Sequence, residues 1–481
     1  MKLLLYLFFL TEVLWATSFS NDVIANVRKG VVSISTRVLK SAYSTAQESH
    51  GSGFIADKKR GLIITNRHVV ASASLGKHEV TFHNGKQVDA TIYYYDPIYD
   101  FALLKVDPRH IPKEARQLAL HPEGAKRDVD VFLIGKNAGQ DFSFQVGRVT
   151  SMDETDGYIQ CQAMRISVNT RGGSSGSAVC DASGRVIGLN HSGTADSHAL
   201  ALSAGYIKPV LTHIQEKGTY TRQSTGAEFT YYYLDRAVKY DAFPTDIARE
   251  YERNYPESQN KVIVVQGTRY KSPAAKVLRP GDIILKVNGQ ETGSNIWMIE
   301  NACQEGKGAV TFTLVRHGKI HTLTVGLYSV EENKIKRLFS FAGGVFYEAD
   351  EGTRARLGIA PRTLLLTNIQ PGGGLHQKFE SLMWEKAPQF ICIRRINNIG
   401  VKSLDDFIGV IKTFAFGDRF SIHYKNFGAW VGYNGELRHS RPLLAAEGDL
   451  YPSDGPPLIH ELNTKTHVWE TKNLWKDTPR H

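Results

Sequence analysis

Short apolar runs broken by glycine, asparagine and aspartate dominate the first part of the chain. Between residues 23 and 217, β-branched runs recur at 30–36 (GVVSIST), 51–55 (GSGFI), 61–65 (GLIIT), 130–135 (DVFLIG) and 147–151 (GRVTS). Many short strands with turn signals at this spacing favour an antiparallel barrel or sandwich over alternating β-α-β units. We therefore predict an all-β domain over residues 21–217.

After residue 217 the pattern changes to mixed helices and strands. Residues 218–230, rich in Thr, Ser and Gly, predict a linker that passes into the first strand of a new module. Residues 272–325 predict a short helix, a strand with an Asn-Gly hairpin turn, a second helix and two further strands. A fainter copy at 390–424 indicates two α+β modules of one kind, at 231–330 and 338–428. The tail, residues 429–481, has little periodicity and is either loosely ordered or packed along the modules.

The first twenty residues have the layout of an export signal. A lysine precedes an apolar run over residues 3–10, and small residues follow at 16–20. The run is too short for a membrane-spanning helix, which needs about 20 residues. We predict a cleaved signal peptide over residues 1–20, with a retained anchor as the alternative, and a mature protein that is periplasmic or secreted.

Charge and cysteine content exclude few function classes. The 481 residues predict about three domains, and the net charge of +10 comes from scattered basic residues that are densest at 58–60 and 334–337. Because no aromatic-interleaved basic stretch accompanies them, a solvated basic surface is favoured over a nucleic-acid site. Four cysteines are too few for a disulfide scaffold. Cys161 and Cys180 fall in one predicted domain, and either a disulfide between them or two buried thiols fits the sequence.

Three segments of the β domain carry the residue types of a Ser-His-Asp triad. They are 61–70 (GLIITNRHVV), 96–104 (DPIYDFALL) and 172–179 (GGSSGSAV). Acyl transfer to a hydroxyl needs a base, a group that holds this base in its useful tautomer, and donors for the oxyanion. His68 fits the base, Asp100 its partner and Ser175 the nucleophile, and the N–H groups of Gly173 and Ser175 fit the oxyanion donors.

Each of these residues also has an ordinary structural role open to it. Glycine-rich serine turns are common hairpins, His68 could end a half-buried strand, and Asp100 could cap a turn. The combination of the three segments and their chain order favour a serine protease.

With these segments and their surroundings, residues 23–425 resemble the HtrA (DegP-like) family of trypsin-fold serine proteases. The resemblance implies an all-β, trypsin-like double β-barrel followed by two PDZ-like α+β modules. Where that family usually reads GNSGG, residues 173–177 read GSSGS, which is similar to the HtrA-like branch known from fungal nuclei. Ser174 and Ser177 are the departures that bear on the nucleophile turn. The resemblance also implies a homo-oligomer such as a trimer, although the segment ahead of the first strand is short.

Substrate specificity is only partly readable. Relatives that cleave after Lys or Arg carry an acid about six residues before the nucleophile, where this chain has Asn169 and Thr170. A desolvated basic side chain would lack its partner there, so we expect aliphatic or small P1 residues. We expect one pocket wall from residues 202–205 and the other from Asn190, His191, Ser192 and Gly193. A buried core strand would also explain these residues.

The two modules present different candidate peptide grooves. A PDZ groove receives a peptide as an added strand and holds its terminal carboxylate on loop N–H groups. In the second module the candidate carboxylate loop consists of Gly343, Gly344, Val345 and Phe346. In the first module residues 226–229 lack the glycine pattern, and Glu228 would repel a carboxylate. Each module either binds C-terminal peptides or packs against the protease domain.

The sequence therefore predicts an exported serine endopeptidase that acts through an acyl-enzyme, without a metal or an organic cofactor. The resemblance implies unfolded or damaged proteins as substrates and a role in envelope protein quality control, and no nucleic-acid partner is expected. One alternative is a chaperone that keeps the fold without catalysis. Another is an adaptor in which the PDZ-like modules bind peptides and carry the function.

Overall fold

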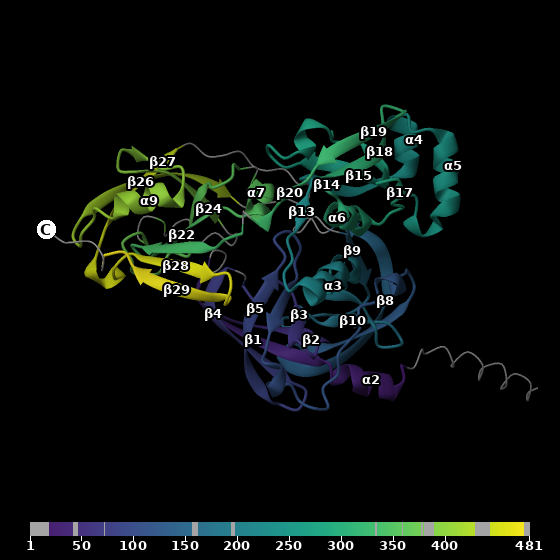
Figure 1. Ribbon diagram of the computed structural model, residues 1–481, viewed down its shortest axis with the longest axis horizontal. Coiled ribbons are helices and arrows are strands. Elements are labelled where there is room, and N and C mark those ends of the chain that lie inside the picture. The colour runs from purple at the N-terminus through teal and green to yellow at the C-terminus, as the bar shows by residue number, and fades with distance from the viewer. Residues whose placement is uncertain are drawn as a thin grey trace, which may run out of the picture.

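A computed structural model describes residues 19–475 apart from 42–46, 72, 156–161, 194–197, 332–333, 358, 377–378, 380–388 and 429–442. In Figure 1 the β-barrels occupy the lower part of the view, the first module lies at the upper right and the second module at the left. Within the described ranges, no helix has the length and apolar character that a membrane crossing requires.

The first barrel is closed, in the strand order β1-β2-β3-β6-β5-β4. Closure leaves no edge strand unpaired, and the inward-facing residues form a packed interior with Ile34, Val80 and Leu104. Its strands are β1 (Val31–Ser41), β2 (Gln47–Asp57), β3 (Leu62–Thr65), β4 (Ser74–Phe82), β5 (Gln87–Tyr95) and β6 (Ala102–Lys105).

The second barrel is also closed, in the order β10-β11-β12-β9-β8-β7. Its strands are β7 (Asp130–Asn137), β8 (Gln140–Thr155), β9 (Gln162–Ile166), β10 (Ala178–Cys180), β11 (Val186–Gly193) and β12 (Ala199–Ser203). One apolar core joins the barrels, because Phe54 and Ile64 of the first pack in the same cluster as Phe132 of the second. The helices α2 (Asn21–Arg28) and α3 (Lys208–Lys217) flank this core. The predicted double barrel is confirmed.

The first module is an antiparallel sheet in the order β14-β15-β16-β18-β19, with β17 paired to β16. Its strands are β14 (Ala227–Tyr233), β15 (Lys261–Thr268), β16 (Ile283–Val287), β17 (Gln290–Glu291), β18 (Ala309–Arg316) and β19 (Lys319–Gly326). Its helices are α4 (Leu234–Tyr240), α5 (Thr245–Asn254) and α6 (Ile296–Glu305). The segment expected as a linker also contains β13 (Gln223–Ser224), which pairs with β20 (Tyr328–Ser329) where the chain leaves the module.

The second module has a larger sheet, in the order β27-β26-β24-β23-β22-β21-β28-β29, with β25 paired to β24. Its elements ahead of residue 429 are β21 (Arg337–Phe341), β22 (Gly344–Glu348), α7 (Glu351–Leu357), β23 (Leu364–Thr367), β24 (Gln389–Ile396), β25 (Ile399–Gly400), α9 (Leu404–Ile411) and β26 (Arg419–Gly428). The segment expected as a tail supplies β27 (Leu444–Asp449), β28 (Leu458–Asn463) and β29 (Val468–Asn473). These strands extend both sides of the sheet, because β27 pairs with β26 and β28 pairs with β21.

Both modules contact the barrels. In the first, Trp297 of α6 lies so close to Gly205 that a Cβ there would stand 2.7 Å from the indole ring. In the second, the Ser340 hydroxyl accepts a hydrogen bond from Lys40 Nζ at 2.9 Å, and the ring of His467 lies 5.2 Å from that of Tyr93. The modules are therefore seated on the protease-like domain.

Candidate active site

Strand register brings His68 and Asp100 together. His68 lies in the turn that follows β3, Asp100 lies just ahead of β6, and the two strands pair with Thr65 opposite Ala102. The Asp100 carboxylate accepts hydrogen bonds from the backbone N–H of His68 at 2.9 Å and from His68 Nδ1 at 2.6 Å. Asn66 Nδ2 donates to the backbone carbonyl of Asp100 at 2.8 Å and fixes the loop from the other side. The arrangement holds the imidazole in the tautomer with its proton on Nδ1, which leaves Nε2 free to act as a base.

The electrostatics of the pair suit a general base. Burial alone would raise the pKa of Asp100, but the charge and hydrogen bond of His68 outweigh it and lower the pKa to about 2. Desolvation alone would lower the pKa of His68, but the Asp100 carboxylate outweighs it and raises the pKa above its usual value. The side chain of Asp100 is only 6% exposed, whereas that of His68 is 49% exposed and reaches the surface of the site. His68 is therefore accessible to a substrate and is stabilised when it takes up a proton.

The Ser175 turn lies against the segment that carries His68. A Cβ on Gly51 would stand 2.5 Å from Val69 Cγ1 and 3.2 Å from the carbonyl oxygen of Ser175, so Gly51 separates the two segments by the width of a backbone. The Ser52 N–H donates to the same Ser175 carbonyl at 2.7 Å. The Ser175 hydroxyl donates to the carbonyl of His191 at 3.4 Å. The structure thus brings the three predicted triad residues to the seam between the barrels.

The backbone around Ser175 contains the two N–H groups that were predicted as oxyanion donors. The Gly172 carbonyl accepts a hydrogen bond from Ala138 N–H at 3.1 Å, which turns this peptide so that the Gly173 N–H faces the opposite way. Within the described part of the chain, neither the Gly173 N–H nor the Ser175 N–H has an acceptor. Gly173 has a φ of 97°, a value that side-chain-bearing residues rarely adopt. Two preorganised donors are therefore open to a developing oxyanion.

Ser52 supports this turn from the neighbouring barrel. Its hydroxyl donates to the Gly173 carbonyl at 2.9 Å and accepts from the Lys136 N–H at 2.8 Å. It therefore links the predicted oxyanion loop to β7. Ser52 lies in the motif GSGFI at residues 51–55, but no local sequence pattern distinguishes this serine as a support for a distant turn.

We expect Ser52→Ala to lower kcat/KM on a peptide substrate. Two hydrogen bonds of about 1 kcal/mol each disappear, and the Gly173 N–H is then held less firmly, so a loss of about tenfold or more is expected. Steady-state kinetics of purified full-length protein measure it. Ser35→Ala is the matched control, because the hydrogen bond of this hydroxyl among the described residues is to the exposed Glu48, at 3.3 Å. Equal kcat/KM for the Ser52→Ala variant and the control would show that the loop keeps its geometry without Ser52.

The two departures from the usual nucleophile motif are both accommodated. Ser174 is buried, and Asn190 Nδ2 donates to its carbonyl at 3.0 Å and to its hydroxyl at 3.3 Å. Ser177 is also buried, against Gly135, where a Cβ would stand 2.1 Å from the Ser177 hydroxyl oxygen. Glycine at 135 leaves room for the extra side chain.

The predicted pocket residues divide into two groups. Asn190 is fully buried and faces Ser174, so it supports the turn, and His191 supplies the carbonyl that accepts from Ser175. Ser192 and Gly193 lie further along β11 and are partly exposed and exposed, respectively. A Cβ on Gly193 would stand 2.9 Å from the Thr170 hydroxyl oxygen. The two pocket walls are therefore close together at Gly193 and Thr170. The Thr170 side chain, which faces Gly193, is uncharged.

The second module uses its predicted carboxylate loop differently. Ala342 and Gly343 form the two-residue turn of the β21–β22 hairpin, with Phe341 paired to Gly344. Val345 and Phe346 are buried in the sheet. The edge of β22 that an added peptide strand would take is occupied by β21, and the next place is taken by β28. The position beside β22 that a bound peptide would take is therefore filled by β21.

In the first module, α6 and β14 both contact the second barrel. The Ile296 N–H at the start of α6 donates to Gln162 Oε1 at 3.0 Å, and the hydroxyl of Thr230 on β14 lies 3.5 Å from that of Thr155 on β8. The charge of Glu228 is balanced, because its carboxylate lies 3.6 Å from Arg269 Nε. These contacts support the alternative in which the first module packs against the protease domain.

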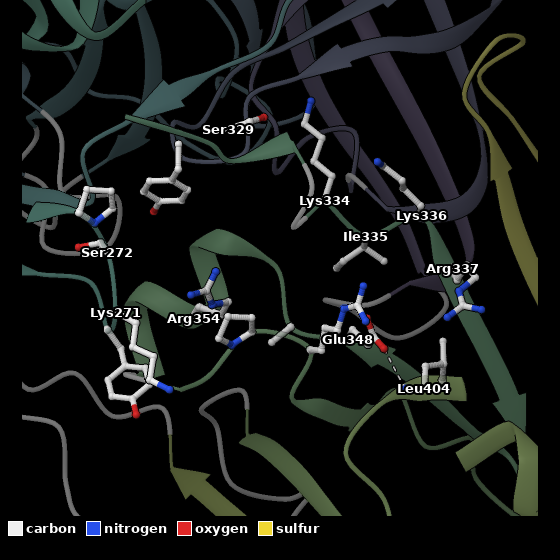
Figure 2. Close-up of a pocket in the computed structure, with 16 residues that line it drawn as sticks. Lys271, Ser272, Ser329, Lys334, Ile335, Lys336, Arg337, Glu348, Arg354 and Leu404 are labelled. Atoms are coloured by element: carbon white, nitrogen blue, oxygen red, sulfur yellow. Dashed lines mark hydrogen bonds between the residues drawn. The ribbon is translucent and has the colours of Figure 1, made fainter. Parts of the chain in front are cut away.

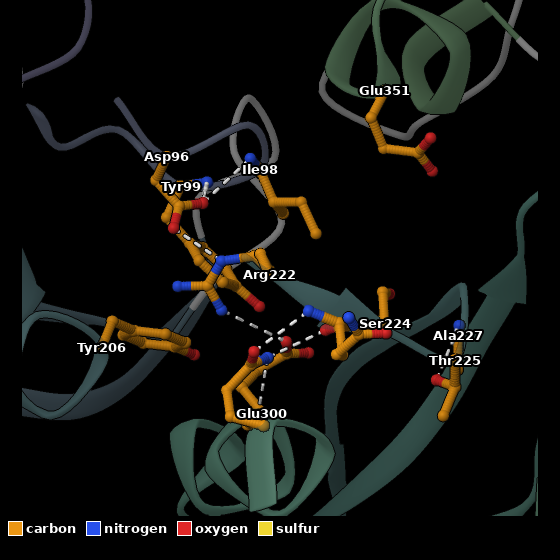
Figure 3. A network of polar contacts seen from close by, with 12 residues as sticks. Asp96, Ile98, Tyr99, Tyr206, Arg222, Ser224, Thr225, Ala227, Glu300 and Glu351 are labelled. Atoms are coloured by element: carbon orange, nitrogen blue, oxygen red, sulfur yellow. Dashed lines mark hydrogen bonds and ion pairs between the residues drawn. The ribbon is translucent and has the colours of Figure 1, made fainter. Parts of the chain in front are cut away.

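A buried ion pair beside the catalytic loop was not foreseen from the sequence. Asp96, four residues before Asp100, pairs with Arg222 Nε at 2.6 Å, and the two side chains are 0% and 2% exposed. Glu300 of α6 lies 3.9 Å from the same guanidinium (Figure 3). The Arg222 guanidinium also lies over the rings of Tyr99 and Tyr220, at 5.0 and 5.6 Å. The segment that leads into the first module is therefore anchored at the loop that carries Asp100.

The predicted cysteine pairing lies partly outside the described residues. Cys161 falls there, and Cys180 is a buried free thiol.

Comparison with known proteins agrees with this geometry. A family profile described as "Trypsin-like peptidase domain" matches residues 51–189. The chain is 26% identical over 446 residues to "Pro-apoptotic serine protease NMA111" of Chaetomium globosum and 24% identical over 452 residues to "Protease Do-like 7" of Arabidopsis thaliana. The chain is similar to HtrA-like serine proteases, and its residues 51–189 match the trypsin-like peptidase domain. These alignments cover 90% and 89% of this chain but only 41% and 39% of the two relatives, so this HtrA-like chain spans about two fifths of their length.

A solved structure, "HtrA-type protease AlgW with tripeptide", is also similar. It is 24% identical, with a TM-score of 0.46, and the match covers 64% of this HtrA-like chain and 96% of that one.

Proposed function

We propose that this HtrA-like chain is a serine endopeptidase with Ser175 as its nucleophile. The observation that carries the proposal is the 2.6 Å pair of His68 and Asp100 beside a turn in which the N–H groups of Gly173 and Ser175 are free within the described residues. Base, orienting group and oxyanion donors are the parts that acyl transfer needs.

The proposed reaction follows the usual steps of acyl transfer. His68 Nε2 takes the proton of the Ser175 hydroxyl as the oxygen attacks the scissile carbonyl, after the hydroxyl has turned away from the His191 carbonyl. The oxyanion is held by the two free N–H groups, and the imidazolium is held by Asp100. His68 then protonates the leaving amine, and water attacks the acyl-enzyme with His68 again as base. The bond from the acyl carbon to Ser175 Oγ breaks as His68 returns the proton to this oxygen, which releases the acid product and restores the enzyme. Every proton passes through His68, so Asp100 stays ionised throughout.

We propose a small or aliphatic P1 side chain. The close approach of Gly193 and Thr170 limits the width of the pocket, and neither residue carries a charge that would balance a desolvated Lys or Arg. A protease with such a pocket suits exposed apolar segments of unfolded or damaged polypeptides, which we propose as its substrates, in protein quality control.

A fluorophosphonate probe tests the enzymatic proposal directly. We expect the full-length protein to be labelled and the mass shift to map to the peptide that contains Ser175, whereas Ser175→Ala is not labelled. Ser453→Ala, which removes an exposed hydroxyl in the second module, is the matched control and keeps full labelling. A correctly folded protein that shows neither Ser175-dependent labelling nor casein cleavage would instead be a non-catalytic chaperone or adaptor.

We also propose that the protein acts after export, in a periplasm or outside the cell. This proposal is supported by the pattern of residues 1–20 alone, most of which lie outside the described residues.

A further inference from the structure

A cavity of about 700 Å³ lies in the seam between the two modules, and we call it the seam cavity. Its wall comes from residues 270–273 and 328–329 of the first module, from the connecting segment 334–337, and from 348–349, 354, 361–362 and 404 of the second. Figure 2 shows Lys271 on one side of this cavity and Lys336 and Arg337 on the other. The basic segment 334–337, which the proposed protease activity does not use, is part of this wall.

The lining of the seam cavity is strongly basic. Six basic residues line it against one acidic residue, Glu348. Three of the six are neutralised by carboxylates outside the wall, since Lys334 pairs with Glu331, Arg337 with Asp405 and Arg354 with Glu351. The other three, Lys271, Lys336 and Arg362, are exposed at the rim, and none of them has an ion pair within the described residues. A ligand in this cavity meets a surplus of positive charge.

Arg354 is the basic residue set deepest in the wall. Its side chain is 9% exposed, and its Nη1 donates to Glu351 at 2.9 Å. Its Nε has no hydrogen-bond partner in the described part of the chain. Figure 2 shows its guanidinium directed into the cavity. A buried cationic donor that is incompletely satisfied favours an anionic acceptor nearby.

The shape of the wall favours an extended ligand of mixed character over a compact phosphate. The unpaired cations come from three separate chain segments and are spread around the rim, so no single site gathers them. The backbone N–H of Leu404, which starts α9 and could hold a phosphate, already donates to Glu348 at 2.9 Å. Between the cations the wall is apolar, at Pro273, Ile335 and Pro361. A polypeptide segment offers both spaced carboxylates and apolar side chains, whereas a polyphosphate offers charge alone.

We propose that the seam cavity binds an acidic segment of a polypeptide, with its carboxylates on Lys271, Lys336, Arg362 and Arg354 and its apolar side chains on the wall between them. This site is separate from the edge of β14 and from the edge of β22, which β21 occupies. The proposal rests on the proposed function only because the bound segment would belong to a protease substrate. The binding itself requires no catalysis.

Binding to full-length Ser175→Ala tests the proposal without interference from cleavage. The probe is a fluorescent 15-residue peptide with carboxylates spaced among apolar residues and an amidated C-terminus, followed by fluorescence anisotropy. We expect saturable binding that weakens as salt is added, and about tenfold weaker binding for K271Q/K336Q/R362Q in the same background. K86Q/K113Q/K465Q is the matched control, because it removes three exposed charges that do not line the cavity and should bind as the parent does.

Three results would overturn the proposal. The first is equal binding by K271Q/K336Q/R362Q and the parent, with circular dichroism showing both folded. The second is equal binding of a peptide in which every Asp and Glu is replaced by Asn and Gln, because charge would then play no part. The third is a polyphosphate that binds in a manner dependent on these three residues while the acidic peptide does not bind. Failure of fluorophosphonate labelling would overturn the protease proposal and leave this measurement unaffected.

Discussion

We expect Asp100→Asn to lower kcat by about four orders of magnitude and to leave the fold intact, because the change is isosteric and removes only the charge and one acceptor role. In the structure Asp100 accepts from both the backbone N–H and Nδ1 of His68. An asparagine amide can donate to Nδ1, which would place the imidazole proton on Nε2, the wrong nitrogen for a base. Measured kcat on a peptide substrate, with thermal melting as the check on folding, gives the result.

The pH profile separates this role from a merely structural one. His68 is active as a base only when neutral, and Asp100 raises the pKa of His68 by stabilising the protonated form. In the parent enzyme kcat/KM should therefore rise with pH through a midpoint above the usual histidine value of about 6.5. In Asp100→Asn the stabilisation of the imidazolium is lost, so the midpoint of the residual activity should move to lower pH. An unchanged midpoint, or a loss of less than about tenfold, would contradict the assignment of Asp100.

The candidate site residues could be proposed from the sequence because each of them lies in a local turn motif. His68, Asp100 and Ser175 each lie in a short motif at the end of a strand, and the register of β3 with β6 then brings two of them into contact. The alternating runs likewise predicted strands, because closed antiparallel barrels require a buried face on each strand. These features are encoded within about ten residues of each site.

Features that depend on distant partners could not be predicted in this way. The sequence around Ser177 does not show whether its side chain fits beside the nucleophile turn. It fits because Gly135 has no Cβ, which leaves room for the Ser177 hydroxyl. Gly343 and Gly344 suit either a carboxylate loop or a hairpin turn, and the pairing of β21 with β22 and with β28 gives them the second role. For the tail, loose order and packing along the modules were both open from the sequence, because the pairing of β28 with β21 joins segments more than a hundred residues apart.

The pair of Asp96 and Arg222 is a further case, and its removal has the second large effect that we expect. The two residues are 126 apart in the chain and almost completely buried. Asp96 also accepts from the Tyr94 hydroxyl at 2.9 Å and from the N–H groups of Ile98 and Tyr99 at 3.0 and 2.8 Å, so it fixes the loop that ends at Asp100. Arg222 connects that loop to the first module.

We expect Arg222→Met to reduce the free energy of unfolding by about 3–5 kcal/mol, because it leaves the Asp96 carboxylate buried without its countercharge. Urea unfolding of the full-length protein measures the loss. Arg419→Met is the matched control: its partner Asp449 lies at 3.0 Å, but the two side chains are 74% and 39% exposed. Removal of such an exposed pair should cost less than about 1 kcal/mol.

A double variant shows whether the uncompensated charge is the cause. Asp96→Asn combined with Arg222→Met removes both charges, so it should be more stable than Arg222→Met alone. Because Asp96 fixes the loop that carries Asp100, Arg222→Met should also lower kcat with little change in KM, and the double variant should recover part of it. A double variant no more stable than Arg222→Met would mean that the ring contacts of Arg222 with Tyr99 and Tyr220, rather than its charge, hold the first module to the catalytic loop.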